Sequence, residues 1–303
     1  MNIAVFSPHS GKSGTTTVAS LVALELSTRG KTVCLTHTSS KSIALSEYFG
    51  LKDLGDDKTA NPSKLVNMLR GGAVKPEEIP EYCKAISLNI DAFTTTDGSI
   101  RPEDMDYILE YMTTSFPHEF KVFDVDTNYF TEEITKKILQ KCDVILIVTT
   151  PGLLELYDLK KELSKLTTLL KYKPAIMVVN KFNRRICDIK SVQGVLGATV
   201  SKKAPWFELR YNPQITRFEN FGKTLDLYNS MRNGDIPVID VYKDVGRIAS
   251  QIMKCGQRGK QIKAKKEMEQ EEKIQQAIKG TKAEAGTASV SLEKEEAPEE
   301  KKA

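Results

Sequence analysis

Short apolar runs alternate with helical patterns along most of this chain, and this alternation constrains its fold more than any other feature. Turn-forming residues bound each run, as in the buried strands of a parallel sheet. Strands are predicted at Asn2–Phe6, Thr32–Thr36, Ala85–Phe93, Lys121–Asp126, Val144–Thr149, Ala175–Asn180 and Trp206–Leu209. Helices are predicted near Gly14–Arg29, Pro62–Leu69, Pro102–Thr114, Glu132–Leu139, Leu153–Leu170 and Ile186–Gly197. The pattern predicts an α/β three-layer sandwich with a mostly parallel, twisted sheet of about seven strands.

Composition is that of an ordinary water-soluble protein. The 303 residues carry a formal charge of +4, and 40% of them are hydrophobic. No stretch of about 18 apolar residues predicts a membrane span. Met1 leads directly into the first predicted strand without a charged or apolar leader pattern, so we expect no signal sequence. The five cysteines are widely spaced, without the C-x-x-C pairing of zinc or redox motifs. We therefore expect a cytoplasmic protein with reduced thiols.

The composition changes near the end of the chain. From Ala264 onward the sequence has ten Glu, eight Lys and no aromatic residue. Such a segment cannot bury enough apolar surface to offset its conformational entropy. We therefore expect a globular domain at residues 1–255, a charged and helix-forming extension at 256–279, and a disordered tail at 280–303.

The last apolar pattern before this extension has helical spacing. Its apolar positions are Val241, Val245, Ile248 and Ile252, and its cations are Lys243, Arg247, Lys254 and Arg258. We favour a helix packed on the sheet, but a basic amphipathic helix lying on anionic lipid also fits the pattern. The lysines within residues 260–266 suit nonspecific binding of nucleic acid. DNA and an anionic membrane are thus alternative partner surfaces, with a location peripheral to the nucleoid or to the membrane.

The turn after the first predicted strand, in the stretch VFSPHSGKSGTTT, is rich in Gly and Ser. Backbone N–H groups of such a turn, at the N-terminus of a helix, hold phosphate oxygens with little help from side chains. The usual phosphate loop, G-x-x-x-x-G-K-[ST], is not matched, because Phe6 stands where its first glycine belongs. The candidate nucleotide-binding residues here are Ser10, Gly11, Lys12, Ser13, Gly14, Thr15 and Thr16.

The opening residues resemble the deviant phosphate loop of the ParA/MinD-type ATPases, x-K-G-G-x-G-K-[ST]-T. Gly11 falls on the second glycine of that loop, and Thr15 and Thr16 fall on its Thr pair. Later segments resemble the family in the same order: FKVFDVDTNY, DVILIVTTPGLLELYDLKKEL, PAIMVVNKFNRR and WFELRYNPQITRFENFGKTL. The resemblance spans Met1 to Val245 and lies in the order of the segments more than in any one motif.

This resemblance implies a bound nucleotide, ATP or ADP with Mg²⁺. Thr15 and Asp126 fall at the positions of metal ligands, and Asn180, Asn212 and Pro213 fall near the base. It also implies a homodimer formed across the nucleotide face and an unidentified protein partner. The last three residues have simpler interpretations, because a strand-end Asn and an Asn-Pro pair are common in turns.

The charged residues of the family's hydrolytic site are missing from their places. The signature lysine, which reaches a phosphate held by the other subunit, falls on His9, and the second lysine falls on Gly14. The D-x-D pair that supplies the catalytic-water aspartate falls on Thr36-His37-Thr38. Loss of one charged stabiliser can slow phosphoryl transfer by ~10³-fold. We therefore expect weak ATP hydrolysis or none.

Lys12 keeps three hypotheses open. Our leading hypothesis is a nucleotide-binding positioning or assembly factor that serves DNA partition or a pilus or secretion machine, as TadZ- and CpaE-like relatives do. In the second, the flexible stem of Lys12 brings its ammonium over a phosphate, and Lys12 and Asp126 are catalytic residues of an active partition ATPase. In the third, Lys12 is a solvated loop lysine of a scaffold that binds no nucleotide.

Overall fold

The computed structural model describes residues 1–8, 11, 13–39, 42–51, 62–94, 101–125, 132–166, 170, 173–199, 204–234 and 238–257. The chain divides into two units, Met1–Gly256 and Gln257–Ala303. All of the second unit except Gln257 lies outside the described residues, as do the predicted tail and nearly all of the predicted extension. The description below therefore concerns the first unit.

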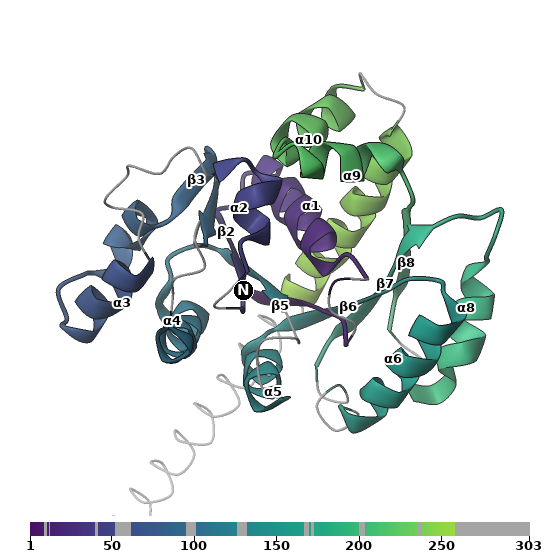
Figure 1. Ribbon diagram of the computed structural model, residues 1–303, viewed down its shortest axis with the longest axis horizontal. Helices are drawn as coiled ribbons and strands as arrows, with labels where there is room; N and C mark the ends of the chain where they lie inside the picture. The colour runs from purple at the N-terminus through teal and green to yellow at the C-terminus, as the bar shows by residue number, and fades with distance from the viewer. Residues whose placement is uncertain are drawn as a thin grey trace, which may run out of the picture. The chain divides into compact units, whose positions relative to one another are not determined.

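Within the described residues, eight strands form one sheet in the order β3-β4-β2-β5-β1-β6-β7-β8 (Figure 1). Only the β3–β4 pair is antiparallel among them. The strands are β1 (Asn2–Phe6), β2 (Val33–His37), β3 (Lys84–Ser87), β4 (Ile90–Phe93), β5 (Phe120–Val125), β6 (Val144–Thr149), β7 (Ala175–Phe182) and β8 (Trp206–Arg210). This sheet confirms the predicted α/β class.

The single strand predicted at Ala85–Phe93 is wrong, because the segment forms the β3–β4 hairpin. Leu88 and Asn89 make the turn, and Leu88 is 97% exposed. An apolar residue at the tip of a turn lengthened the apparent apolar run, while Asn89 is the residue type that a tight turn favours. The hairpin adds the eighth strand at the edge of the sheet.

Helices cover both faces of the sheet (Figure 1). One layer contains α3 (Pro62–Arg70), α4 (Pro102–Ser115), α5 (Glu132–Lys141), α6 (Leu153–Lys165) and α8 (Ile189–Leu196). The other contains α1 (Thr15–Thr28), α2 (Ala44–Tyr48), α9 (Pro213–Asn220), α10 (Thr224–Asn233) and a C-terminal helix at 239–257. Two 3-10 turns, η2 (Pro76–Tyr82) and η3 (Gly197–Thr199), complete the described helices. The three-layer sandwich is confirmed, although α2, α9 and α10 were not among the predicted helices.

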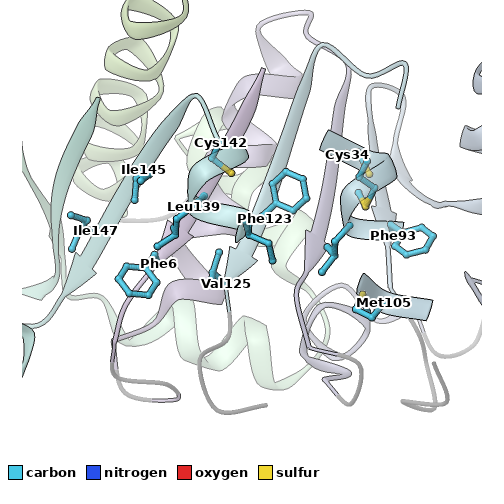
Figure 2. Packing of buried hydrophobic residues seen from close by; sticks show 14 of the residues in the cluster. Phe6, Cys34, Phe93, Met105, Phe123, Val125, Leu139, Cys142, Ile145 and Ile147 are labelled. Atoms are coloured by element: carbon cyan, nitrogen blue, oxygen red, sulfur yellow. The ribbon is translucent and has the colours of Figure 1, made fainter. Parts of the chain in front are cut away.

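Two apolar cores lie on opposite faces of the sheet, because successive strand side chains point to opposite sides. Ile3 and Val5 belong to one core, and Ala4 and Phe6 belong to the other. Figure 2 shows this second core, in which side chains of β1, β2, β4, β5 and β6 meet α4 and α5: Phe6, Cys34, Phe93, Met105, Phe123, Val125, Leu139, Cys142, Ile145 and Ile147. A doubly covered sheet of this kind explains why its strands are uniformly apolar.

The C-terminal helix packs on the sheet. Val241, Val245, Ile248 and Ile252 are buried in the core that also holds α1 and α10. Their burial confirms the core-packing interpretation of this segment. A separate finding is that no helix of the described ranges is long and apolar enough to cross a membrane.

The order of the strands fixes where a ligand site can form. Helix α1 leads from β1 past β5 to β2, whereas α5 leads from β5 past β1 to β6. The chain thus leaves the adjacent strands β1 and β5 in opposite directions. In open α/β sheets, ligands bind at the carboxyl ends of the strands at such a point. The loop between β1 and α1 starts at this place.

Candidate functional site

Two side-chain contacts anchor the end of the loop between β1 and α1. Ser7 Oγ, just after β1, lies 2.6 Å from Ser13 Oγ. Asn180 Nδ2, on β7, donates a hydrogen bond of 2.8 Å to the Ser13 carbonyl oxygen. All three side chains are buried. These contacts hold Ser13, two positions before α1, against the ends of β1 and β7, the two strands that flank β6.

Gly14 is the N-cap of α1 and has left-handed backbone angles, φ 74° and ψ 41°. A Cβ atom built on Gly14 would lie 2.4 Å from Asn180 Nδ2, which is far inside van der Waals contact. Both the backbone conformation and the neighbouring amide therefore require glycine. This is the position on which the family's second lysine falls. A lysine here would strain the backbone and displace the Asn180 amide.

The first turn of α1 presents backbone donors rather than side-chain charge. Gly14 provides no side-chain cap, and the first turn has no acidic residue. The first bond of the helical ladder runs from Val18 N to Gly14 O, 3.1 Å, so the N–H groups of residues 15–17 have no partner within the helix. Such N–H groups and the helix dipole favour an anion at this end.

Thr16 links this turn to strand β5. Its Oγ1 donates a hydrogen bond of 2.6 Å to Asp124 Oδ2, and Asp124 is buried. Of the predicted metal ligands, Thr15 begins α1 and is half-buried, whereas Asp126 lies outside the described residues. Ser10 and Lys12 also lie outside them, and Gly11 is exposed with φ 73°.

The oxygen donors fit Mg²⁺ only together with a ligand. Mg²⁺ prefers hydroxyl, carboxylate, water and phosphate oxygens, and in nucleotide sites it takes only one or two protein ligands. Within the described residues, no group of three or more His, Cys, Asp or Glu side chains is placed to hold a metal ion. The Thr15–Thr16 turn with Asp124 behind it therefore suits an ion brought in by phosphates.

Glu219 is a buried carboxyl group that the sequence analysis missed. Thr17 Oγ1, in the first turn of α1, donates a hydrogen bond of 2.6 Å to Glu219 Oε1 on α9. Burial raises the pKa of Glu219 to about 7, although the Thr17 hydrogen bond and Lys181 oppose the rise. Burial also raises the pKa of Tyr48 to about 12, and the Glu219 carboxylate adds to that shift.

One sequence signal could have located Glu219. It stands four positions after Ile215, and both side chains are on the buried face of α9. Residues four apart share one face of a helix, so Glu219 occupies an inward position. Because α9 was not predicted as a helix, this position was not recognised as buried.

The segment in place of the family's D-x-D pair is part of the core. Thr36 and His37 end strand β2, and both are buried together with Thr38. Thr36 Oγ1 donates to Phe93 O at 3.0 Å, and His37 Nε2 lies 2.9 Å from Thr94 Oγ1. These contacts tie the end of β2 to the end of β4. The segment supplies no carboxylate to orient a water molecule.

The three predicted base-contacting residues have structural partners. Asn180 holds Ser13 through Nδ2, and its Oδ1 accepts from Lys181 N at 2.8 Å. Asn212 caps α9 by accepting from Gln214 N at 3.0 Å, and Pro213 is the first residue of that helix. The turn interpretation accounts for this geometry, and contact with a base stays a prediction for all three.

Comparisons with known proteins identify the fold. No protein-family model matches the chain, and no curated protein matches it. Among solved structures, the MinC:MinD complex of Aquifex aeolicus matches with a TM-score of 0.61 at 18% identity, over 83% of this chain and 95% of that one. MinD of Pyrococcus horikoshii with Mg-ADP matches with a TM-score of 0.58 at 16% identity, over 83% and 95%.

A ParA family ATPase of Chlorobium tepidum is similar to the same extent, with a TM-score of 0.58 at 17% identity over 82% of this chain and 98% of that one. These matches cover nearly the full length of each solved chain. The chain therefore has the fold of the MinD and ParA ATPases, and the structure confirms the predicted resemblance at the level of the fold.

Proposed function

We propose that this chain is a ParA/MinD-like positioning or assembly factor that binds Mg·ATP or Mg·ADP and hydrolyses ATP weakly or not at all. The observation that carries the proposal is Gly14. The N–H groups that follow it have no partner within α1 and are available for phosphates. A side chain at position 14 would strain the backbone and displace the Asn180 amide, so glycine stands where the family has its second lysine. Phosphate binding depends on backbone N–H groups, which this chain keeps. Hydrolysis depends on the family's charged side chains, which are missing from their places here.

The described residues bind and orient rather than react. The N–H groups that open α1 hold phosphate oxygens, and the Ser7–Ser13 and Asn180–Ser13 contacts keep that turn in place. Mg²⁺, when bound with the nucleotide, supplies positive charge to the phosphates. Thr15 is its predicted protein ligand. Thr16, bonded to Asp124, fixes the turn against β5.

The relatives support a nucleotide ligand. MinD of P. horikoshii was solved with Mg-ADP, and a plasmid partition protein of Borrelia burgdorferi, with a TM-score of 0.53 at 16% identity, was solved with AMPPNP. The A. aeolicus match is a complex of MinD with MinC. By analogy we propose an unidentified protein partner and a role in DNA partition or in a pilus or secretion machine.

Exposed apolar side chains support a homodimer across the nucleotide face. Leu153, Leu154 and Tyr157, at the start of α6, are 58%, 77% and 55% exposed, and Tyr211, just after β8, is 56% exposed. These segments follow the carboxyl ends of β6 and β8, the edge of the sheet from which the loop before α1 also starts. Exposed apolar groups that share one edge favour burial against a second copy.

The metal assignment gives a direct test. In calorimetric titrations with ATP, Thr15→Val is expected to weaken binding on the order of tenfold in Mg²⁺ and to leave Mg²⁺-free binding unchanged, because only the hydroxyl ligand is lost. Thr16→Val is the matched control. It should lower thermal stability through loss of the Asp124 hydrogen bond while changing the Mg²⁺ dependence less.

Two outcomes contradict the proposal. If the wild-type chain binds no nucleotide at millimolar concentration, the scaffold hypothesis replaces it. If Thr15→Val binds Mg·ATP as tightly as the wild type, Thr15 is not the metal ligand.

A further inference from the structure

A basic groove of about 660 Å³ lies beside the C-terminal helix, and no residue of the loop before α1 lines it. Six of its ten lining residues are Arg or Lys, and none of the described residues that line it is acidic. The lining comes from the end of α1, from the segment after β7, from β8 and from the C-terminal helix: Arg29, Arg184, Phe207, Arg210, Lys243, Gly246, Arg247, Ser250, Gln251 and Lys254. We define this set as the basic groove.

Buried acids outside the lining hold the arginines in place. Arg210 donates from Nε and Nη2 to the two carboxylate oxygens of Asp244, both at 2.8 Å, and Asp244 is fully buried. Arg29 Nε donates to Glu25 Oε1 at 2.8 Å, and its Nη2 donates to Gly246 O at 2.8 Å. These contacts fix the guanidinium groups as rigid walls of the groove and occupy their donors, so the charge left for an anion comes from the lysines.

The lysines of the groove supply charge that no acid offsets. Lys243 and Lys254 are exposed and form no ion pair with a residue that the structure describes. They lie on the outward face of the C-terminal helix, with Arg247 one turn after Lys243. Their position beside the fixed arginines gives the groove a positive surplus that attracts multivalent anions.

We propose that the basic groove binds a compact polyphosphate, the phosphate chain of a nucleoside polyphosphate or inorganic polyphosphate, at a second site separate from the loop before α1. The volume lies within the range of about 300–1,000 Å³ typical of small-ligand sites. The ammonium groups of Lys243 and Lys254 match phosphate oxygens, whereas the arginine forks beside them are held by carboxylates. Phe207, half-buried in the wall, offers an apolar contact.

Neighbouring features favour a compact ligand over a long polymer or a membrane. Asp240, which is 59% exposed and pairs with Arg210, and Glu208, which pairs with Arg184, place negative charge next to the groove. A duplex that crossed the groove would pass these carboxylates. A lipid surface requires exposed apolar side chains beside the cations, and the groove has no exposed aromatic or aliphatic side chain among its described lining residues.

The test is a calorimetric titration of the full chain with inorganic tripolyphosphate in EDTA. We expect tripolyphosphate to bind and its affinity to fall with added salt. Orthophosphate should bind much more weakly, because the groove holds several phosphates at once. Lys243→Ala/Lys254→Ala should weaken tripolyphosphate on the order of tenfold or more. Lys243→Arg/Lys254→Arg should bind like the wild type. Lys160→Ala/Lys161→Ala, on α6, is the matched control for net charge.

Three outcomes would overturn the proposal. The first is tripolyphosphate binding that does not change when Lys243 and Lys254 are removed. The second is tripolyphosphate binding that Mg·ADP displaces and that is the same in the lysine variant as in the wild type. This result would assign the tripolyphosphate site to the loop before α1. The third is lysine-dependent binding of short duplex DNA or of anionic phospholipid vesicles without binding of tripolyphosphate. The Mg²⁺-dependent ATP binding that Thr15→Val weakens should persist in the lysine variant, so failure here is distinguishable from failure of the proposed function.

Discussion

Gly14→Lys is expected to destabilise the chain by about 2–3 kcal/mol rather than to restore a catalytic lysine. From the sequence alone, adding this lysine back would be expected to tighten nucleotide binding. The structure changes that expectation, because position 14 has φ 74° and a Cβ there would lie 2.4 Å from Asn180 Nδ2. The substitution strains the backbone and displaces the amide that holds Ser13. Urea denaturation of the purified variant measures the loss.

Gly11 provides a matched control. It has almost the same backbone conformation, φ 73°, but a Cβ there would meet nothing within 4 Å. Gly11→Lys should therefore lower the free energy of unfolding only by the cost of a left-handed backbone at a non-glycine residue, about 1–2 kcal/mol. A double-mutant cycle of Gly14→Ala with Asn180→Ala should show coupling, since removal of the amide relieves the clash. Equal losses for the two glycine variants, with no coupling, would contradict the role assigned to Asn180.

The stability of the chain is expected to fall as pH rises through the titration of Glu219. Burial raises its folded-state pKa to about 7 from an ordinary value of 4.5. The folded state therefore binds the proton more tightly than the unfolded state. The stabilisation that comes from this tighter proton binding is fully present below the unfolded-state pKa. It is lost as the pH rises through the folded-state pKa. The change amounts to about 3 kcal/mol between pH 4.5 and pH 8.

Glu219→Gln isolates this effect, because its amide oxygen can still accept from Thr17 while the side chain cannot ionise. Free energies of unfolding should be measured for both proteins by urea denaturation across this pH window. Relative to the variant, the wild type should lose about 3 kcal/mol at the alkaline end. Parallel pH profiles for the two proteins would show that Glu219 titrates normally.

Periodicity was enough to predict the layers of the fold. Buried parallel strands have a local signature, so β1 and β6 were predicted with the bounds that the structure gives them. The β3–β4 hairpin was missed because an exposed Leu88 looked like part of an apolar strand. Local sequence carries the preference of a segment, but not which of its apolar residues reach the core.

The candidate site was only partly predictable. The Gly/Ser turn before α1 was recognised, because backbone donors at a helix N-terminus depend on local sequence. The contact between Gly14 and Asn180 was not recognised, since it joins residues far apart in the chain and depends on how β7 lies beside the loop. The Thr17–Glu219 hydrogen bond was missed for the same reason. Long-range polar contacts of this kind become visible only once the strands are placed in order.

Simultaneous measurement of nucleotide binding and single-turnover hydrolysis tests the central claim most directly. The wild-type chain should bind Mg·ATP, yet its turnover should stay below the ~10⁻⁴ s⁻¹ of a GTPase without its arginine finger. Position 14 has no lysine, and residues 36–38 have no carboxylate to orient water. Hydrolysis on the scale of minutes that is lost in Lys12→Ala would contradict the account and make Lys12 a relocated catalytic lysine.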